Sequence, residues 1–302
     1  MMTIACPFCG ANHWNAEKVA NSPPHRPEFT ACCQRGHIDV PYQSQPPDTL
    51  STLLDSNNDD ARHFRENIQQ YNMALAFMSL GITEEKNVNR QGGWVFRVQG
   101  ELCHLIGLLH PDEDKPPSYA QLYIYDSHMA LAQRMNRNNN LSKNLMDSLQ
   151  SMLIDFHQYA TEFKHAYEVL EQYPDESDAS IWLRIMPGQD QRHYNVPTSD
   201  EVDAILPGDG TAPERHNIIP RPRSQGNSLS RINDGHPAYS PLHYVLLFPN
   251  GDNGWHRELY HHPVPGTVPS PAWKPPRVSQ TQYSLFHLHM HNTEYLTIHR
   301  GG

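Results

Sequence analysis

The stretch CPFCGANHW, at residues 6–14, decides how this chain begins to fold, because it places Cys6 and Cys9 in a Cys-x-x-Cys turn. A second pair of neighbouring cysteines, Cys32 and Cys33, follows in the stretch FTACCQRGH at residues 29–37. Four thiolates delivered by two short turns are the usual way in which a chain builds a closed tetrahedral zinc site. The sequence therefore predicts a structural zinc ion held by Cys6, Cys9, Cys32 and Cys33.

The identity of the fourth ligand is open at this stage. Adjacent cysteines seldom ligate one ion comfortably, so His13, His25 or His37 could take the place of Cys33. A disulfide framework or a pair of buried free thiols is the structural alternative. A redox Cys-x-x-Cys is disfavoured, since no predicted strand leads into the motif and no helix follows it. No signal peptide precedes the cysteines, so we expect a reducing compartment, in which disulfides are rare.

Composition and charge limit the classes of function. The chain has 302 residues, a mean hydropathy of −0.68, 26 prolines and 20 histidines, and no apolar run near the roughly 20 residues that span a bilayer. Its net charge of −10 lies entirely in residues 1–200, with 15 Lys and Arg against 25 Asp and Glu. Such an acidic body is a poor autonomous nucleic-acid binder, because phosphate neutralisation supplies most non-specific affinity. We therefore expect a loop-rich globular protein with no membrane partner.

One stretch is locally basic, at residues 215–231, in a segment rich in proline, serine and glycine. As an extended arm it would contact a phosphate backbone. As an ordinary surface loop it would only carry solvating charge, which is the more frequent case. The candidate nucleic-acid contacts in this stretch are Arg215, Arg221, Arg223 and Arg231.

Apolar periodicity predicts two long helices. The first carries one stripe from Phe64 to Met78, is capped by Asp59 or Asp60 and ends at Gly81. The second runs over residues 142–173, with Ser142 as its N-cap and Pro174 as its stop. A short third helix is expected over residues 198–206, where Thr198 and Glu201 have capping-box spacing.

Short apolar runs predict strands between these helices. Residues 94–98 and 102–109 are typical of a hairpin around Gly100-Glu101, and residues 121–125, 181–186 and 245–248 are typical of single strands. The prolines of residues 261–277 predict an irregular segment. The mixture indicates an α+β fold. We expect a small zinc-binding module at residues 1–42, a mixed helix and antiparallel-sheet domain with long proline-rich loops at 50–206, and a loop-rich segment at 207–302.

Signatures of catalysis are scarce. The sequence has no phosphate-binding loop, no dinucleotide fingerprint and no nucleophile-elbow serine, so it indicates no small-molecule substrate. On a strand, His287 and His289 would project from one face and could hold a divalent metal beside a phosphodiester. A nuclease of that type also needs a tyrosine nucleophile on a helix, and neither Tyr283 nor Tyr295 has a predicted capped helix around it. We therefore expect no catalytic residue in this chain and keep His287 and His289 as the alternative.

Several strings together resemble the N-terminal region of eukaryotic Helitron transposases, the rolling-circle Rep–helicase proteins. They occur in the order of that family and span most of the chain from residue 6 to residue 302. The strings are CPFCGANHW, FTACCQRGHIDVP, HFRENIQQYNMALAFMSLG, FRVQGELCHLIGLLHP, YAQLYIYD, YNVPTSDEVDAILPG, INDGHPAYSPLHYVLLFPNGDNGWH and the terminal HRGG. Two departures stand out. His37 occupies a position where relatives commonly carry lysine, and residues 156–163 lack the Asn-Pro break of relatives, so the second helix is expected to run on unbroken.

The resemblance implies a nuclear protein that acts on transposon DNA, single-stranded or at the ends of the element. It also implies that the nicking and helicase domains of the parent protein lie further toward its C-terminus, so that this chain stops before them. By that reading the region is non-catalytic and supports DNA recognition or positioning together with those domains. The alternatives are a metal-dependent single-strand nuclease that uses His287 and His289, and a host-retained interaction protein with no role on DNA.

Overall fold

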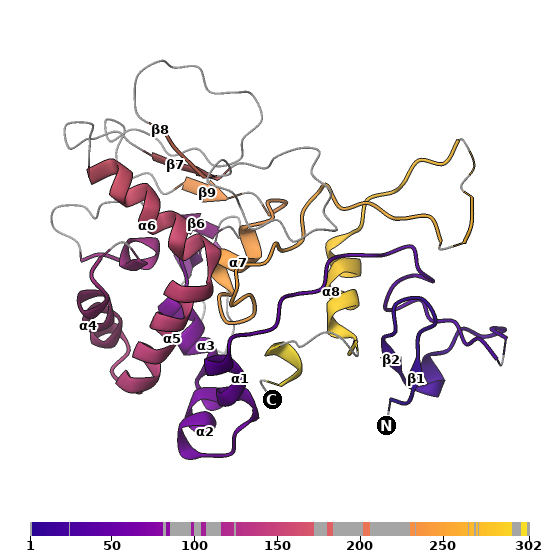
Figure 1. Ribbon diagram of the computed structural model, residues 1–302, viewed down its shortest axis with the longest axis horizontal. Coiled ribbons are helices and arrows are strands. Elements are labelled where there is room, and N and C mark those ends of the chain that lie inside the picture. Colours follow the sequence, from indigo (N-terminus) through magenta and orange to yellow (C-terminus); the bar gives the residue numbers. More distant parts are fainter. Residues whose placement is uncertain are drawn as a thin grey trace, which may run out of the picture.

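The computed structural model describes most of the N-terminal, central helical and C-terminal parts of the chain (Figure 1). Its described residues are 2–23, 25–80, 83–84, 98–99, 104–106, 116–123, 125–171, 180–183, 202–205, 230–232, 234–264, 266–268, 270, 272–291 and 297–300. Within them, helices and short antiparallel strands occur together, which fits the α+β class. Among the described helices, none combines the length and the apolar character that crossing a bilayer demands.

Helices of the central part enclose the larger of two apolar clusters, and Figure 1 shows them gathered on one side of the molecule. Its largest fully buried side chains include Tyr71, Phe77 and Leu149. The helices are α1 (Asp48–Asp55), α2 (Asp59–Glu66), α3 (Ile68–Leu75), α4 (Ser127–Arg137), α5 (Lys143–Phe156), α6 (Gln158–Glu171) and α7 (Tyr239–His243).

The first long helix predicted from the sequence is two helices, α2 and α3, separated at Asn67. The backbone of Asn67 leaves the helical region, with φ −118° and ψ 15°, and its side-chain amide donates to the carbonyl of His63 at 2.9 Å. Asparagine competes in this way with the helix for backbone hydrogen bonds, which explains the break. The prediction was also wrong at both ends, because the N-cap is Asn58 and α3 ends at Leu75.

The expected unbroken second helix is likewise wrong. Ser142 caps α5 as predicted, with its hydroxyl accepting from the amide of Leu145 at 3.5 Å. The helix stops at Phe156 and resumes as α6 at Gln158, because His157 adopts an extended backbone. A distant segment stabilises the break: the amide of Gln158 donates to the carbonyl of Asn250 at 3.2 Å. No local sequence pattern signals such a contact.

The strands are short and pair antiparallel. Strand β6 (His104–Ile106) lies between β3 (Ser79–Leu80) and β9 (Ser230–Ile232). Strand β4 (Thr83–Glu84) pairs with β5 (Val98–Gln99), so β5 and β6 belong to different sheets and do not form the hairpin expected there. Two further pairs are β1 (Ile4–Ala5) with β2 (Asn12–His13), and β7 (Ser180–Leu183) with β8 (Val202–Ile205).

Other predicted elements had mixed outcomes. Strand β7 confirms the strand expected over residues 181–186 as far as Leu183, whereas β8 takes up residues 202–205 of the helix expected over 198–206. The other residues of both ranges lie outside the described ones. The strand expected at residues 121–125 is a 3-10 helix, η3 (Tyr119–Tyr123). Val245, Leu246 and Phe248 are buried, but residues 245–248 form turns after α7 and not the strand expected there. The described residues of 261–277 are irregular as predicted, apart from a single bridge between Tyr260 and Arg277.

The N-terminal segment packs against the C-terminal one. In Figure 1, helix α8 (Gln280–Leu288) lies between the helical part and the segment that carries β1 and β2. A second, smaller apolar cluster joins the cysteines and Phe29 to Leu259, Val278 and Phe286. The core of the first 42 residues is therefore completed by residues more than 200 positions away. The three-part division at residues 42 and 206 stays a prediction.

Candidate metal centre

The first pair of cysteines sits in a tight turn. The amide of Gly10 donates to the carbonyl of Cys6 at 2.9 Å, and the amide of Cys6 donates to the carbonyl of Ala11 at 2.8 Å. Gly10 has φ +75°, yet a Cβ there would meet nothing within 4 Å. Glycine is thus required at this position by its backbone conformation and not by lack of space. The turn places the side chains of Cys6 and Cys9 on the same side.

The second pair sits in a turn with three successive residues at positive φ, Gln34, Arg35 and Gly36. The amide of Gly36 donates to the carbonyl of Cys33 at 3.0 Å and lies 3.2 Å from its Sγ. An amide that donates to sulfur stabilises negative charge on that sulfur. The backbone is therefore wound so that Cys33, although adjacent to Cys32, turns its thiol inward.

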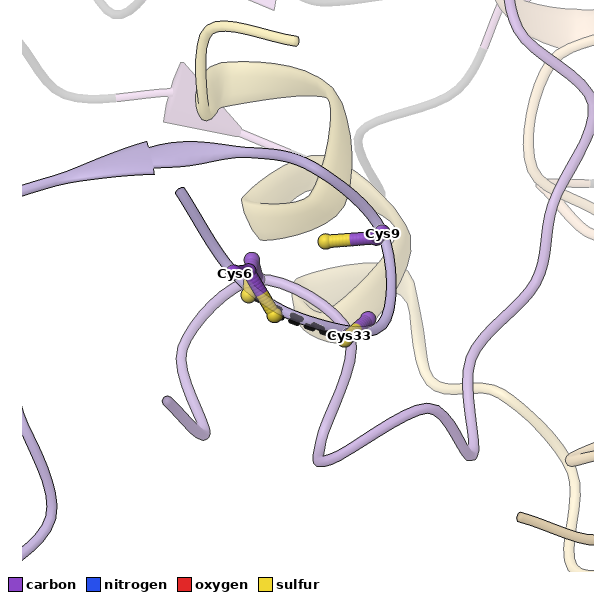
Figure 2. A group of neighbouring side chains, drawn as sticks. Cys6, Cys9 and Cys33 are labelled. Atoms are coloured by element: carbon purple, nitrogen blue, oxygen red, sulfur yellow. Dashed lines mark hydrogen bonds between the residues drawn. The ribbon is translucent and has the colours of Figure 1, made fainter. Parts of the chain in front are cut away.

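The sulfurs of all four cysteines converge. They lie within 4.8 Å of one another, with 3.7 Å between Cys6 and Cys33 and 3.8 Å between Cys32 and Cys33. Figure 2 shows the side chains of Cys6, Cys9 and Cys33 pointing toward one another. These separations exclude a disulfide, whose sulfurs would be about 2.05 Å apart. Four sulfurs at about 2.3 Å from a tetrahedral zinc ion are about 3.8 Å apart, so the arrangement fits that ion closely.

The ionisation of these thiols also favours a cation. Hydrogen bonds from Cys32 and then Cys33 lower the pKa of Cys6 to about 7. The same neighbours lower the pKa of Cys9, with Cys32 again the largest cause, whereas Cys33 and the other thiols raise the pKa of Cys32. The four groups therefore cannot all ionise side by side unless a positive charge compensates them. A divalent metal supplies that charge, because a coordinating thiol is deprotonated.

The cluster is largely closed to solvent. Cys6, Cys32 and Cys33 are buried, and Cys9 is half-buried. The hydroxyl of Tyr42 donates to the carbonyl of Cys9 at 3.2 Å, and its ring lies 5.1 Å from that of His291. His291 in turn forms a hydrogen bond with the thiol of Cys9 that helps lower its pKa. Four sulfur donors with no open position are typical of a structural site and not of a catalytic one.

The histidines that competed with Cys33 as the fourth ligand lie elsewhere. Nδ1 of His37 donates to the carbonyl of His262 at 3.1 Å. His25 is exposed in a turn. His13 is fully buried and stacks on Phe29 with ring centroids 4.0 Å apart, in a separate group with Glu17 and His289. The structure thus groups Cys33 with the other three cysteines.

His287 and His289 do not project from a strand, as the nuclease alternative would require. His287 lies in α8, where its ring packs 4.5 Å from Tyr283 at a cavity of about 270 Å³, and His289 is the C-cap of the same helix. His289 turns toward His13, with ring centroids 4.7 Å apart. The last turn of a helix separates the two rings by about 200° of rotation, which sends them to different surroundings.

The basic stretch is only partly described. Arg215, Arg221 and Arg223 lie outside the described residues. The backbone of Arg231 lies in β9, where it is opposite Leu105 of β6. The C-terminal end of the stretch is therefore part of a sheet and not of a free arm.

Comparison with known proteins does not assign a family. No model of a known protein family matches the chain, and no curated protein is significantly similar to it. The resemblance to Helitron transposases stays a prediction from the sequence motifs.

Proposed function

We propose that this chain is a zinc-containing, non-catalytic region of a Helitron-like transposase that supports the recognition or positioning of transposon DNA in the nucleus. The observation that carries the proposal is the convergence of four cysteine sulfurs, at separations that match the edges of a zinc tetrahedron. The sequence resemblance supplies the biological setting. Neither the DNA nor the downstream Rep and helicase domains are part of the structure, and they enter as proposed partners.

Zinc is the metal that this donor set favours. Thiolates are soft ligands, and a tetrahedral set of four sulfurs selects zinc or iron–sulfur chemistry over calcium or magnesium. When bound, the ion supplies a cross-link between the turn of Cys6–Cys9 and the turn of Cys32–Cys33. That cross-link is needed because the smaller apolar cluster has far fewer buried members than the larger one, and α8 is its one described helix of more than one turn.

The charge of the zinc module, residues 1–42, does not favour phosphate binding, because its basic and acidic residues are balanced. Residues 1–42 hold three basic residues, Lys18, Arg26 and Arg35, and three acidic ones, Glu17, Glu28 and Asp39. Arg35 forms an ion pair with Glu28 at 3.2 Å, and Arg26 lies over the ring of Phe8 at 5.0 Å. We therefore assign phosphate contact to the basic stretch that ends in β9, and a positioning role to the module.

The test combines zinc analysis with binding of single-stranded DNA over a range of salt concentrations. We expect one tightly bound zinc ion per chain at the cysteine cluster and weak, salt-sensitive binding. The double variant Arg221→Ala/Arg223→Ala should weaken binding and reduce the slope of log K against log salt by about 1.4, at about 0.7 per phosphate contact. Arg62→Ala is the matched control, because Arg62 is exposed on α2, where it forms an ion pair with Asp59 at 3.1 Å and a hydrogen bond to the carbonyl of Asn57 at 3.5 Å.

Other outcomes would replace the proposal. Zinc without DNA binding at any salt would indicate a protein-interaction module. Metal-dependent cleavage of the DNA would indicate a nuclease, and its loss in His287→Ala/His289→Ala would assign the activity to these two histidines. The structure does place Tyr283 on the capped helix α8 beside His287, but it does not bring the rings of His287 and His289 together, since they face different neighbours.

A further inference from the structure

We propose that His13 and His289 bind a second divalent cation, separate from the cysteine cluster, which joins the N-terminal segment to the end of α8, and that Glu17 orients His13 for this role. Each of the three residues offers one donor atom, and these atoms lie within 4.8 Å of one another. The proposal does not depend on the assignment of the chain to a transposase. It rests on side-chain geometry alone.

The hydrogen bonds of the two imidazoles leave one nitrogen of each ring for a ligand. Nδ1 of His13 donates to Oε2 of Glu17 at 2.8 Å, and Nδ1 of His289 donates to the carbonyl of Leu285 at 2.6 Å. Carboxylates and carbonyls only accept, so both protons are on Nδ1 and both Nε2 atoms carry a lone pair. Histidines that ligate metals show this same pattern, in which the second nitrogen donates to a carboxylate or a backbone carbonyl.

His13 provides an independent sign that a partner is missing from its surroundings. Its side chain is fully buried, and its Nε2 has no hydrogen-bond partner among the described residues. A buried polar atom without a partner destabilises the fold, and a bound cation would offset that cost. The stacked ring of Phe29, 4.0 Å away, fixes the orientation of the imidazole.

Backbone contacts hold the three residues in register. The amide of Asn12 donates to the carbonyl of Met290 at 2.9 Å, which ties β2 to the residue after His289. Glu17 ends the 3-10 helix η1 (Asn15–Glu17), and its Oε2 also accepts from the amide of Trp14 at 3.2 Å. The carboxylate is therefore fixed beside His13 whether or not a cation is present, and it supplies a negative charge that attracts one.

The donor set defines the class of cation. Two imidazoles suit Zn²⁺, Ni²⁺, Co²⁺ or Cu²⁺, whereas Ca²⁺ and Mg²⁺ prefer oxygen ligands. Glu17 accepts from Nδ1 of His13 and so orients the ring from the edge opposite Nε2. His13 is buried, but His289 is only half-buried and Glu17 is 34% exposed. Water can therefore complete the coordination on the open side, unlike at the cysteine cluster. We infer a weaker, exchangeable site that fastens α8 to the zinc module.

The experiment counts metal in the full chain. Wild-type protein is titrated with Zn²⁺, and bound metal is measured after equilibrium dialysis against defined free zinc. We expect His289→Ala and Glu17→Gln each to bind one equivalent fewer than the wild type, or to bind that equivalent about 10–100-fold more weakly. His128→Ala is the matched control, because His128 is an exposed histidine at the start of α4 outside the cluster. The control should retain every equivalent.

A second measurement reports the proposed fastening. Hydrogen exchange of the amide of His289, which donates to the carbonyls of Leu285 and Phe286 at 3.3 Å, should slow when the weaker equivalent binds. It should stay unchanged by zinc in His289→Ala once the cysteine cluster is filled. The proposal is wrong if His289→Ala binds as much zinc as the wild type with equal affinity. Because the criterion is a difference between variants, it holds whether or not the cysteine cluster takes its own ion.

Discussion

The two apolar clusters of this protein are built on opposite plans. The larger one is enclosed by helices whose stripes of leucine, methionine and aromatic side chains bury one another. The smaller one has little regular structure, and three of its buried members are the cysteines Cys6, Cys32 and Cys33. The first cluster is stabilised by the burial of apolar surface. The second is arranged around cysteine thiols that converge on one position. Removal of a metal should therefore affect one cluster and spare the other.

The largest expected effect follows from replacing a thiol. In Cys33→Ser, or in wild type treated with a strong zinc chelator, we expect the segment from Phe29 to Val40 to lose its fold while α5 keeps its own. Zinc binding to structural sites contributes about 10–16 kcal/mol in small zinc-finger peptides, far more than so small an apolar cluster can replace. Backbone hydrogen exchange checks both regions in one experiment.

Cys103→Ser is the matched control, because Cys103 is the one cysteine outside the four. It should leave zinc content unchanged. Equal loss of protection in α5 and in the cysteine segment would show that the two clusters form one cooperative unit, and the contrast drawn above would fail.

The same contrast explains what the sequence could predict. The cysteine spacing identified the four residues that converge, and the apolar spacing identified the stripe from Phe64 to Met78, both of whose ends are fully buried. Both signals are local and depend on residue type. The choice of Cys33 over His13 or His37 could not be predicted from residue type, because it depends on the backbone of the turn after Cys33, where Gln34, Arg35 and Gly36 have positive φ angles.

The errors arose where distant segments decide the local structure. His157 breaks a helix because residues 241 and 250 accept hydrogen bonds there, and no pattern within residues 142–173 contains that information. The group of His13, Glu17 and His289 was missed for the same reason. A His at position 13 and a Glu four residues later is a weak signal, and it gains meaning only when α8 brings His289 beside them.

A core substitution should act on the helical cluster alone. Leu149 on α5 is fully buried, so Leu149→Ala removes buried methyl groups and leaves a cavity, at a cost of about 2–5 kcal/mol in the free energy of unfolding. Urea denaturation followed by circular dichroism measures this loss. Met129→Ala on α4 is the control, since Met129 is 58% exposed and its truncation should cost under about 0.5 kcal/mol. Zinc content should stay at the wild-type value in both variants, and its loss in Leu149→Ala would contradict the separation of the clusters.

Acid should weaken the helical cluster through His157. Burial lowers the pKa of this imidazole to about 4, although Nε2 donates to the carbonyl of Pro241 at 3.3 Å. Between pH 6.5 and about 4 the unfolded chain binds a proton that the folded chain does not, so stability falls as the pH falls through this window. Above pH 6.5 the contribution is fully present, and below about pH 4 the loss is complete. It amounts to about 3 kcal/mol.

The variant His157→Gln tests this, because glutamine can still donate to the carbonyl of Pro241 but does not titrate. Urea denaturation at pH 7.5 and at pH 4.5 should show a smaller drop in the variant than in the wild type. His256, whose pKa burial also lowers to about 4, remains in both proteins, so its effect cancels in the difference. An equal drop in the two proteins would show that His157 binds a proton as readily in the folded chain as in the unfolded one.

The smallest expected effects come from two helix caps, one on each cluster. Asn58 accepts from the amide of Ala61 at 2.8 Å and caps α2, and Ser279 forms a capping box with Gln282 on α8. Either substitution by alanine should cost about 1 kcal/mol. Asn58→Ala should raise exchange only in the helical part, with or without zinc. Ser279→Ala should raise hydrogen exchange around α8 while zinc is bound. Once a chelator has removed the zinc, the variant and the wild type should exchange equally fast there, because α8 has then lost the apolar cluster against which it packs. If each of the two substitutions raised hydrogen exchange equally in the helical part and around α8, the two clusters would unfold as one unit. Their different chemistry would then not give them separate stabilities.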